Sequence, residues 1–280
     1  MFVAPLLVAA LFVPPTAESA PAPDGPTAAA VPPATGAPPA TGEPAAPGEP
    51  AATDEEKPKW RSLFDGKSLD GWVVTEFGGQ GDVAVEDGAI VLPFGNNVTG
   101  VTVSEAVGKT LPGTNYVLEL EAKRVSGNDF FCGLTLPVWS PKDEKASHAT
   151  LILGGWGGGL VGLSSINRFD ASENPTTTYH RFEDGAWYKV RVEVTKSGVR
   201  ALLDGEELFA ADIRDSLIST RSEVNLSKPL GIATYITTGA IRGVRIRPLS
   251  EEEIAAVDKA CEPFDPTGGD RPVNEFGEKN

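Results

Sequence analysis

The sequence predicts an all-β fold: an antiparallel sandwich of two packed sheets, followed by one short C-terminal helix. Three observations predict it. From Trp60 onward, short runs of β-branched and aromatic residues are separated by Gly, Asn and Asp. Several runs place apolar residues at every second position, as in a strand buried on one face. The runs number about a dozen, which suits two packed sheets better than one small barrel.

The first 59 residues are expected to lie outside this fold. Met1 to Val13 is an apolar run with the length of a signal-peptide core, and an uncleaved anchor would need about 20 apolar residues. We therefore predict a signal peptide over residues 1–20 and a secreted or periplasmic bacterial protein. Residues 21–59 are mainly Pro, Ala, Gly, Thr and acidic residues, which predicts a disordered linker. The mature chain is expected to have no membrane span and to be a monomer.

The β-sandwich domain is predicted over residues 60–250. Its first hairpin is expected over residues 82–92, where Gly88 supplies the positive φ of a tight turn. Residues 116–124 and 187–195 alternate between apolar and charged side chains, so each has one face for the core and one for water or ligand. The other expected strands lie at 100–104, 129–138, 149–155, 160–166, 199–203, 207–210, 230–236 and 240–247.

The C-terminal part, residues 251–280, is predicted to hold a short surface helix and a tail. Ser250 followed by Glu253 is a capping-box pattern ahead of apolar positions. The two cysteines, Cys132 and Cys261, have two possible roles. In an oxidising compartment they could pair, but the apolar surroundings of Cys132 favour a small buried side chain.

Charge and motif content exclude several classes of function. The formal net charge is −15 and the sequence pI is about 4.6, so a nucleic-acid partner is not expected. A Ser-His-Asp hydrolase is disfavoured because no Gly-x-Ser-x-Gly elbow occurs. Two cysteines are too few for a Cys-ligated zinc site, and the glycine run at 154–159 lacks the Lys of a phosphate-binding loop.

Four motifs carry a resemblance to a known family. They are LFDGKSLDGW at 63–72, GAWYKVRVEV at 185–194, LDGE at 203–206 and GAIRGVRIRPL at 239–249. In order and spacing they resemble the 3-keto-disaccharide hydrolase domain over nearly all of residues 60–250. The resemblance implies a concanavalin A-like jelly roll that cleaves 3-keto-glycosides by elimination and hydration. The stretches 126–131, 148–167 and 170–180 depart from the common pattern of the family.

This resemblance leads to a carbohydrate as the predicted partner and to a search for catalytic groups. Elimination needs a general base and a group that stabilises the enolate. His148 and His180 border the distinctive stretches and are candidate bases or metal ligands, although each can equally be an ordinary loop or strand-end residue. Glu121 is a third catalytic candidate; with Glu119 it faces one side of a strand, where both can instead form a solvated charged face.

Binding residues are predicted from the same stretches. Trp156, inside the glycine run, can stack on a sugar ring or fill the core. The further substrate-binding candidates are Asn128, Asp129, Asn167 and Arg181. Asp170 and Glu173 could hold a divalent cation such as Ca²⁺, or only shape a turn. The predicted function is a secreted 3-keto-glycoside hydrolase or lyase; the alternative is a noncatalytic glycan-binding or adhesion module.

Overall fold

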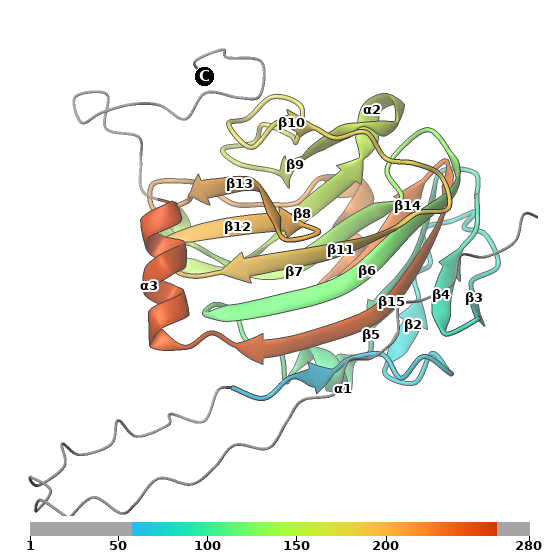
Figure 1. The fold of residues 1–280 in the computed structure, drawn as a ribbon, viewed down its shortest axis with the longest axis horizontal. Coiled ribbons are helices and arrows are strands. Elements are labelled where there is room, and N and C mark those ends of the chain that lie inside the picture. The colour runs from blue at the N-terminus through green and yellow to red at the C-terminus, as the bar shows by residue number, and fades with distance from the viewer. Residues whose placement is uncertain (1–57, 262–280) are drawn as a thin grey trace, which may run out of the picture. The chain divides into compact units, whose positions relative to one another are not determined.

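The computed structural model describes residues 58–261 of the chain. Within them, two antiparallel β-sheets pack face to face as a jelly-roll sandwich, which confirms the predicted fold class (Figure 1). The predicted signal peptide, nearly all of the predicted linker and the tail beyond residue 261 lie outside the described residues. In the part of the chain from 58 to 261, no helix is long and apolar enough to cross a membrane.

The first sheet, called sheet A, has eight strands among the described residues. Its order is β13-β12-β11-β6-β15-β4-β3, with β1 paired to β15. The strands are β1 (Arg61–Ser62), β3 (Ala84–Glu86), β4 (Ala89–Leu92), β6 (Tyr116–Gly127), β11 (Trp187–Val194), β12 (Gly198–Leu203), β13 (Glu206–Asp212) and β15 (Thr237–Pro248). The predicted hairpin over 82–92 is the β3–β4 pair.

The second sheet, called sheet B, has seven strands in the same described part. Its order is β10-β9-β8-β7-β14-β5-β2. The strands are β2 (Trp72–Val74), β5 (Val98–Val103), β7 (Cys132–Ser140), β8 (Lys145–Gly154), β9 (Leu160–Ser164), β10 (Thr178–Tyr179) and β14 (Gly231–Tyr235). Neighbouring strands in this sheet are often distant in sequence: β14 lies between β5 and β7.

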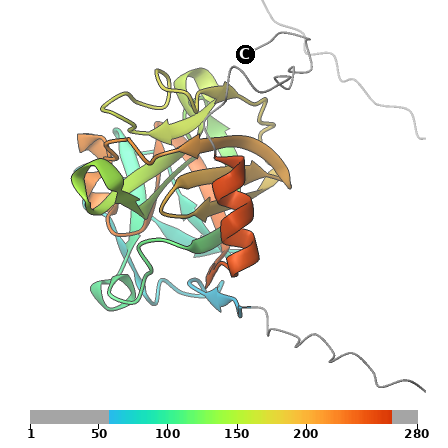
Figure 2. The ribbon, with the colours of Figure 1, turned by 90° about the vertical axis from the view of Figure 1, so that its left-hand side faces the viewer.

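Short helical segments join and cover the strands. They are α1 (Glu105–Gly108), η1 (Pro141–Asp143), α2 (Gly155–Gly158), η2 (Ser222–Ser227) and α3 (Glu251–Ala260). The α2 segment is a glycine turn between β8 and β9, because Trp156 and Gly157 have φ of 46° and 91°. The α3 helix begins with the predicted capping box and lies across the strand ends of sheet A (Figures 1 and 2).

The core lies between the inward faces of the two sheets. In β6 the predicted apolar face is buried, and its first residue, Tyr116, donates a 2.6 Å hydrogen bond to the Pro137 carbonyl of sheet B. Cys132 is in this core, whereas Cys261 packs beneath α3, and both are free, buried thiols. Burial raises the pKa of each thiol to about 12. The structure therefore confirms the buried interpretation of Cys132.

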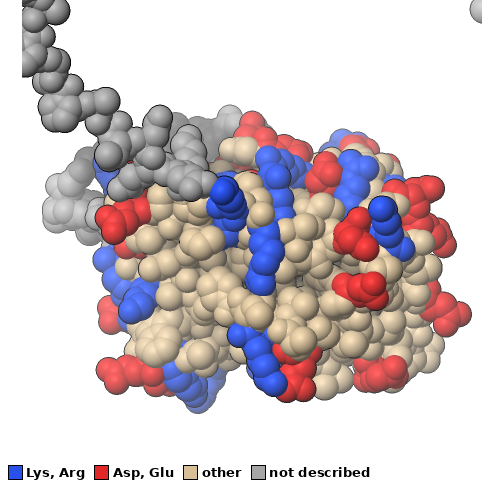
Figure 3. Space-filling model, turned by 90° about the horizontal axis from the view of Figure 1, so that it is seen from below, with Lys and Arg blue, Asp and Glu red and all other residues tan. Residues whose placement is uncertain are grey.

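The outer face of sheet A carries a network of ion pairs. The buried Glu119 carboxylate accepts hydrogen bonds from Arg191 of β11 and Arg245 of β15. Glu121 pairs with Arg242 at 2.7 Å. Each charge thus has a partner on a neighbouring strand, which is the arrangement that stabilises opposite charges across a sheet. On the side of the molecule seen in Figure 3, acidic and basic side chains are likewise interspersed.

Candidate functional site

A pocket opens on the outer face of sheet B. Strand alternation creates its floor: Leu151 and Leu153 of β8 point into the core, so Thr150 and Ile152 point outward. The cavity measures about 290 Å³. This lies at the small end of the range of ligand pockets, which is about 300–1,000 Å³. The lining residues are Val98, Asp129, Phe130, Thr150, Ile152, Trp156, Ser164, Arg221, Glu223, Val224 and Tyr235.

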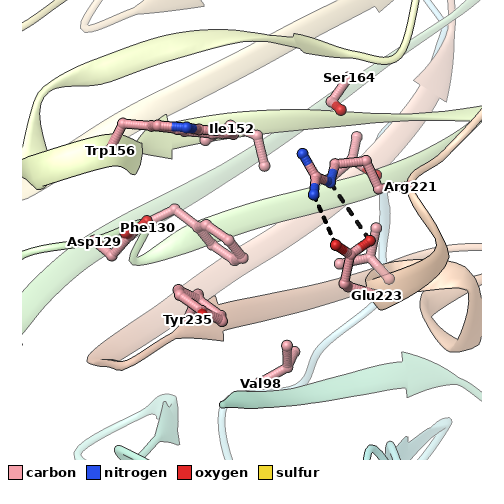
Figure 4. A pocket seen from close by; sticks show the side chains of 11 residues that line it. Val98, Asp129, Phe130, Ile152, Trp156, Ser164, Arg221, Glu223 and Tyr235 are labelled. Atoms are coloured by element: carbon pink, nitrogen blue, oxygen red, sulfur yellow. Dashed lines mark hydrogen bonds and ion pairs between the residues drawn. The ribbon is translucent and has the colours of Figure 1, made fainter. Parts of the chain in front are cut away.

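One wall of the pocket is aromatic. The rings of Phe130 and Tyr235 stack with centroids 5.8 Å apart and an interplanar angle of 23°. Trp156 projects from the glycine turn between β8 and β9, and it is 46% exposed (Figure 4). An exposed indole facing a pocket offers an apolar surface on which the C–H face of a sugar ring can stack.

Asp129 lies beside this aromatic wall, at the entrance to β7. Burial raises the pKa of its carboxyl above the ordinary value, although a hydrogen bond from the Phe130 N–H and an interaction with the Trp156 N–H oppose the shift. The bond from Phe130 measures 2.7 Å. A half-buried carboxylate with a raised pKa inside a pocket is a candidate general base.

The opposite wall carries charge, as Figure 4 shows. The Arg221 guanidinium donates to Glu223 at 2.7 Å and to Asp170 at 2.7 Å. Its hydrogen bonds hold the pKa of Glu223 at about 2, so Glu223 is ionised under ordinary conditions. This wall therefore presents fixed ionised groups: Glu223 can accept hydrogen bonds from sugar hydroxyls, and Arg221 can donate hydrogen bonds to them.

The structure brings two of the sequence-predicted site residues into the pocket, namely Trp156 and Asp129. Asn128 directly precedes Asp129 and is exposed. His148 is on the outward face of β8, the same face as Thr150, but it is not among the lining residues. Burial, followed by the charge of Lys228, lowers the pKa of His148 to about 4, so its ring is neutral at neutral pH.

Other predicted residues lie elsewhere. The His180 ring packs on Phe182 and Tyr188, with centroids 4.7 Å and 5.8 Å away. Glu121 is on the outer face of sheet A, which faces away from the pocket side of the sandwich. The Asn167 side chain accepts a hydrogen bond from the Leu217 N–H, and Arg181 is exposed and paired with Glu183. The roles predicted for these residues stay predictions.

The surroundings of Asp170 do not fit a bound cation. Its carboxylate accepts from the Ser172 N–H and hydroxyl and from Arg221. Glu173 is exposed, and its contact with Asp170 is a backbone hydrogen bond within the turn. Among residues 58–261, no three His, Cys, Asp or Glu side chains gather as a metal site would require. No step of the chemistry proposed below passes through a metal ion.

Sequence reasoning did not find nine of the eleven residues that line the pocket, among them the aromatic Phe130 and Tyr235 and the charged Arg221 and Glu223. Phe130 lies in the loop before β7 and Tyr235 ends β14, and Tyr235 donates its backbone N–H to the Phe130 carbonyl at 3.0 Å. Arg221 directly precedes η2 and Glu223 lies within it. This segment has no strong sequence pattern. The one available signal was the Arg-x-Glu spacing, which occurs often on charged surfaces and is therefore unspecific.

The fold and the pocket define the class of protein: a two-sheet β-sandwich with an aromatic-walled, sugar-sized pocket on the outer face of one sheet. The chain belongs to the 3-keto-alpha-glucoside-1,2-lyase-like domain family, whose model matches residues 59–247. This membership confirms the resemblance inferred from the motifs and makes the domain carbohydrate-related. No curated protein matches the chain.

Three solved structures are similar to this chain. A glycosyl hydrolase candidate from Parabacteroides distasonis is 16% identical, with 68% of this chain and 94% of that one covered and a TM-score of 0.40. The carbohydrate-binding module CBM66 from Bacillus subtilis is 14% identical, with 63% and 95% covered and a TM-score of 0.38. Domain 4 of AbnA, a GH43 extracellular arabinanase from Geobacillus stearothermophilus, is 16% identical, with 72% and 100% covered and a TM-score of 0.41.

Proposed function

We propose that this protein is an exported enzyme that cleaves 3-keto-glycosides by base-catalysed elimination and hydration in the pocket of sheet B. The observation that carries the proposal is the Asp129 carboxylate, whose pKa is raised and which lies beside the exposed Trp156. Membership of the lyase-like family supports the choice of substrate class. The proposed location is the periplasm or the cell exterior, and the proposed state is a monomer.

In this reaction Asp129 has the role of the general base. A ketone at C3 acidifies the hydrogen on C2, so Asp129 can take that proton while the C1–O bond breaks and the aglycone leaves. The product is an enone between C1 and C3. Water then adds its oxygen to C1 and gives up one proton, which neutralises the departed aglycone alkoxide directly or through solvent. The proton held by Asp129 returns to C2, so the net reaction is hydrolysis. The raised pKa of Asp129 suits this role because the base must first capture and later release a proton.

The other walls have supporting roles. Trp156 and the Phe130–Tyr235 stack offer the surface on which the sugar ring lies. The hydroxyls of Thr150 and Ser164 are buried and bonded to Thr135 and Ser165, whereas the partly exposed Arg221 guanidinium can donate hydrogen bonds to the negative oxygen of the enolate. Glu223 and Arg221 can fix the orientation of the sugar through its hydroxyls.

The test is aglycone release from a 3-keto-glucoside by the mature protein, with and without EDTA. Asp129→Asn keeps the size of the side chain but removes the base, so the rate should fall by about 100-fold or more. The matched control is Asp87→Asn in the β3–β4 turn, where Asn tolerates the positive φ of 48°. Full activity in Asp129→Asn would rule out Asp129 as the base. His148→Ala and His180→Ala test the two histidines in the same assay.

A noncatalytic glycan-binding module is the second candidate. The observation that favours it is that three aromatic residues line the pocket while neither histidine does. This alternative needs aromatic platforms and no tuned base. Under it, wild-type protein releases no aglycone but still binds the sugar, and Trp156→Ala weakens binding by about tenfold, as the loss of a stacked indole should. Thermal stabilisation by the sugar measures that binding.

A further inference from the structure

Arg124, at the outer end of β6 in sheet A, reaches the glycine turn that carries Trp156. The residue is 9% exposed. Its guanidinium donates to the Gly158 carbonyl at 2.9 Å, to the Phe182 carbonyl at 2.6 Å and to the Asp184 carboxylate. One buried side chain thus joins the turn after β8 to the segment after β10 by three hydrogen bonds. Charge-assisted bonds of this kind are stronger than neutral ones.

Backbone hydrogen bonds also hold the turn: the Gly159 N–H donates to the Gly155 carbonyl, and the His180 N–H donates to the Gly159 carbonyl at 2.9 Å. Trp156 has φ of 46° and ψ of 61°, a left-handed conformation that a residue with a side chain adopts at a cost. Gly158 has φ of 99°, and a Cβ atom there would lie 2.8 Å from Nη1 of Arg124. The glycine at this position therefore allows the guanidinium to approach the turn closely.

The turn is also bound to the proposed base. The backbone N–H of Trp156 interacts with the Asp129 carboxylate and acts to lower its pKa. A Cβ atom on Gly155 would lie 3.8 Å from Oδ1 of the same carboxylate. A continuous chain of contacts therefore runs from Arg124 through the Gly158 carbonyl and the turn to the indole of Trp156 and the carboxylate of Asp129.

We propose that Arg124 is a positioning residue of the pocket: it holds the glycine turn so that Trp156 faces the sugar and the Trp156 N–H reaches Asp129. The inference rests on the proposed function of the pocket, but it concerns the conformation of the turn and is measurable without a reaction. Arg124 does not touch the substrate in this scheme. Its nearest pocket contact is the backbone of the turn.

The experiment compares wild type with Arg124→Lys, which keeps the charge and loses the planar fork that serves three acceptors at once. The proteins are labelled with 5-fluorotryptophan, and Trp156→Phe assigns the Trp156 resonance among the five tryptophans. The Asp129 carboxyl is titrated by carbon NMR. The matched control is Arg200→Lys, a partly buried arginine paired with Glu193 and Glu207 on the outer face of sheet A.

In Arg124→Lys the Trp156 resonance should shift or broaden, and the carboxyl of Asp129 should titrate at higher pH because the Trp156 N–H moves away from it. KM for the 3-keto-glucoside should rise by about tenfold, with a matching upward shift of the pH–rate profile. Arg200→Lys should change neither resonance nor profile. In Gly158→Ala the added Cβ atom should push the Arg124 guanidinium away from the turn. This variant should therefore reproduce the Arg124→Lys spectrum.

An unchanged Trp156 resonance together with an unchanged Asp129 titration in folded Arg124→Lys would overturn the inference. Folding of each variant is checked by its circular dichroism and melting temperature. A wild-type protein that releases no aglycone would instead overturn the proposed enzyme, and the two NMR readings would still decide the role of Arg124. The two failures are therefore distinguishable.

Discussion

At the scale of single residues, the Asp129 carboxyl sets the expected pH dependence of the reaction. Its pKa is raised by burial, and two backbone N–H groups oppose that shift. The base works only when ionised, so kcat/KM should fall as the pH drops through this raised pKa, above the usual value of 3.8. The measurement is kcat/KM between pH 3 and 8. A rate unchanged down to pH 3 would contradict a base with a raised pKa.

His148 gives a second prediction at this scale. Burial and the nearby Lys228 lower its pKa from 6.5 to about 4. Because the unfolded chain binds the proton more readily, His148 contributes stability that is present above pH 6.5 and lost as the pH falls toward 4. Proton NMR should show a neutral ring at pH 5.5. Titration near 6.5 in the folded protein would contradict the burial argument.

At the scale of elements, the N-terminus of α3 is a defined stabilising unit. Ser250 accepts a hydrogen bond from the Glu253 N–H at 3.2 Å, and Glu253 accepts from the Ser250 N–H and from both terminal nitrogens of Arg247. The Arg247 hydrogen bonds lower the pKa of Glu253 to about 2. Since its folded pKa is depressed, the stability from Glu253 is present above about pH 4.5 and is lost toward pH 2.

Removing this cap should cost stability without unfolding the sandwich. Ser250→Ala should lower the free energy of unfolding by about 1 kcal/mol, the usual cost of losing a helix N-cap. The measurement is urea denaturation at pH 7. Glu252→Gln, on the exposed side of the same turn, is the control and should change stability little. An equal loss of unfolding free energy in both variants would contradict this prediction, because it would mean that the negative charge of the first turn, and not the Ser250 cap, supplies the stability.

At the scale of the whole molecule, the pocket and the core share sheet B: its outer face is the floor of the pocket, and its inner face packs in the core. Core packing therefore also supports the site. Leu134 of β7 is fully buried between the sheets, whereas Leu226 of η2 is 57% exposed. Leu134→Ala should lower the free energy of unfolding by about 2–5 kcal/mol, because it leaves a cavity. Leu226→Ala should cost far less. Equal losses of unfolding free energy in the two variants, measured by denaturation, would mean that the core relaxes around the missing Leu134 side chain.

Much of the fold could be predicted from the sequence, because strand alternation and turn chemistry are local properties. The apolar positions of 116–124 and 187–195 form the buried faces of β6 and β11, and the turn at Gly88 closes the predicted hairpin. The capping box at Ser250 and Glu253 could also be predicted from the sequence, since its two partners are three residues apart. The motifs at 63–72, 185–194, 203–206 and 239–249 identified the family.

Only the tertiary structure decided where the site lies. The pocket joins Asp129, Trp156 and Tyr235 with Arg221 and Glu223, and these residues come from separate segments of the chain between residues 129 and 235. The jelly-roll order that inserts β14 between β5 and β7 brings Tyr235 next to Phe130. The same topology puts Glu121 on sheet A, on the other side of the sandwich. Local patterns set the strands and their buried faces, but the pairing of distant strands depends on packing across the whole chain, and that pairing made the pocket.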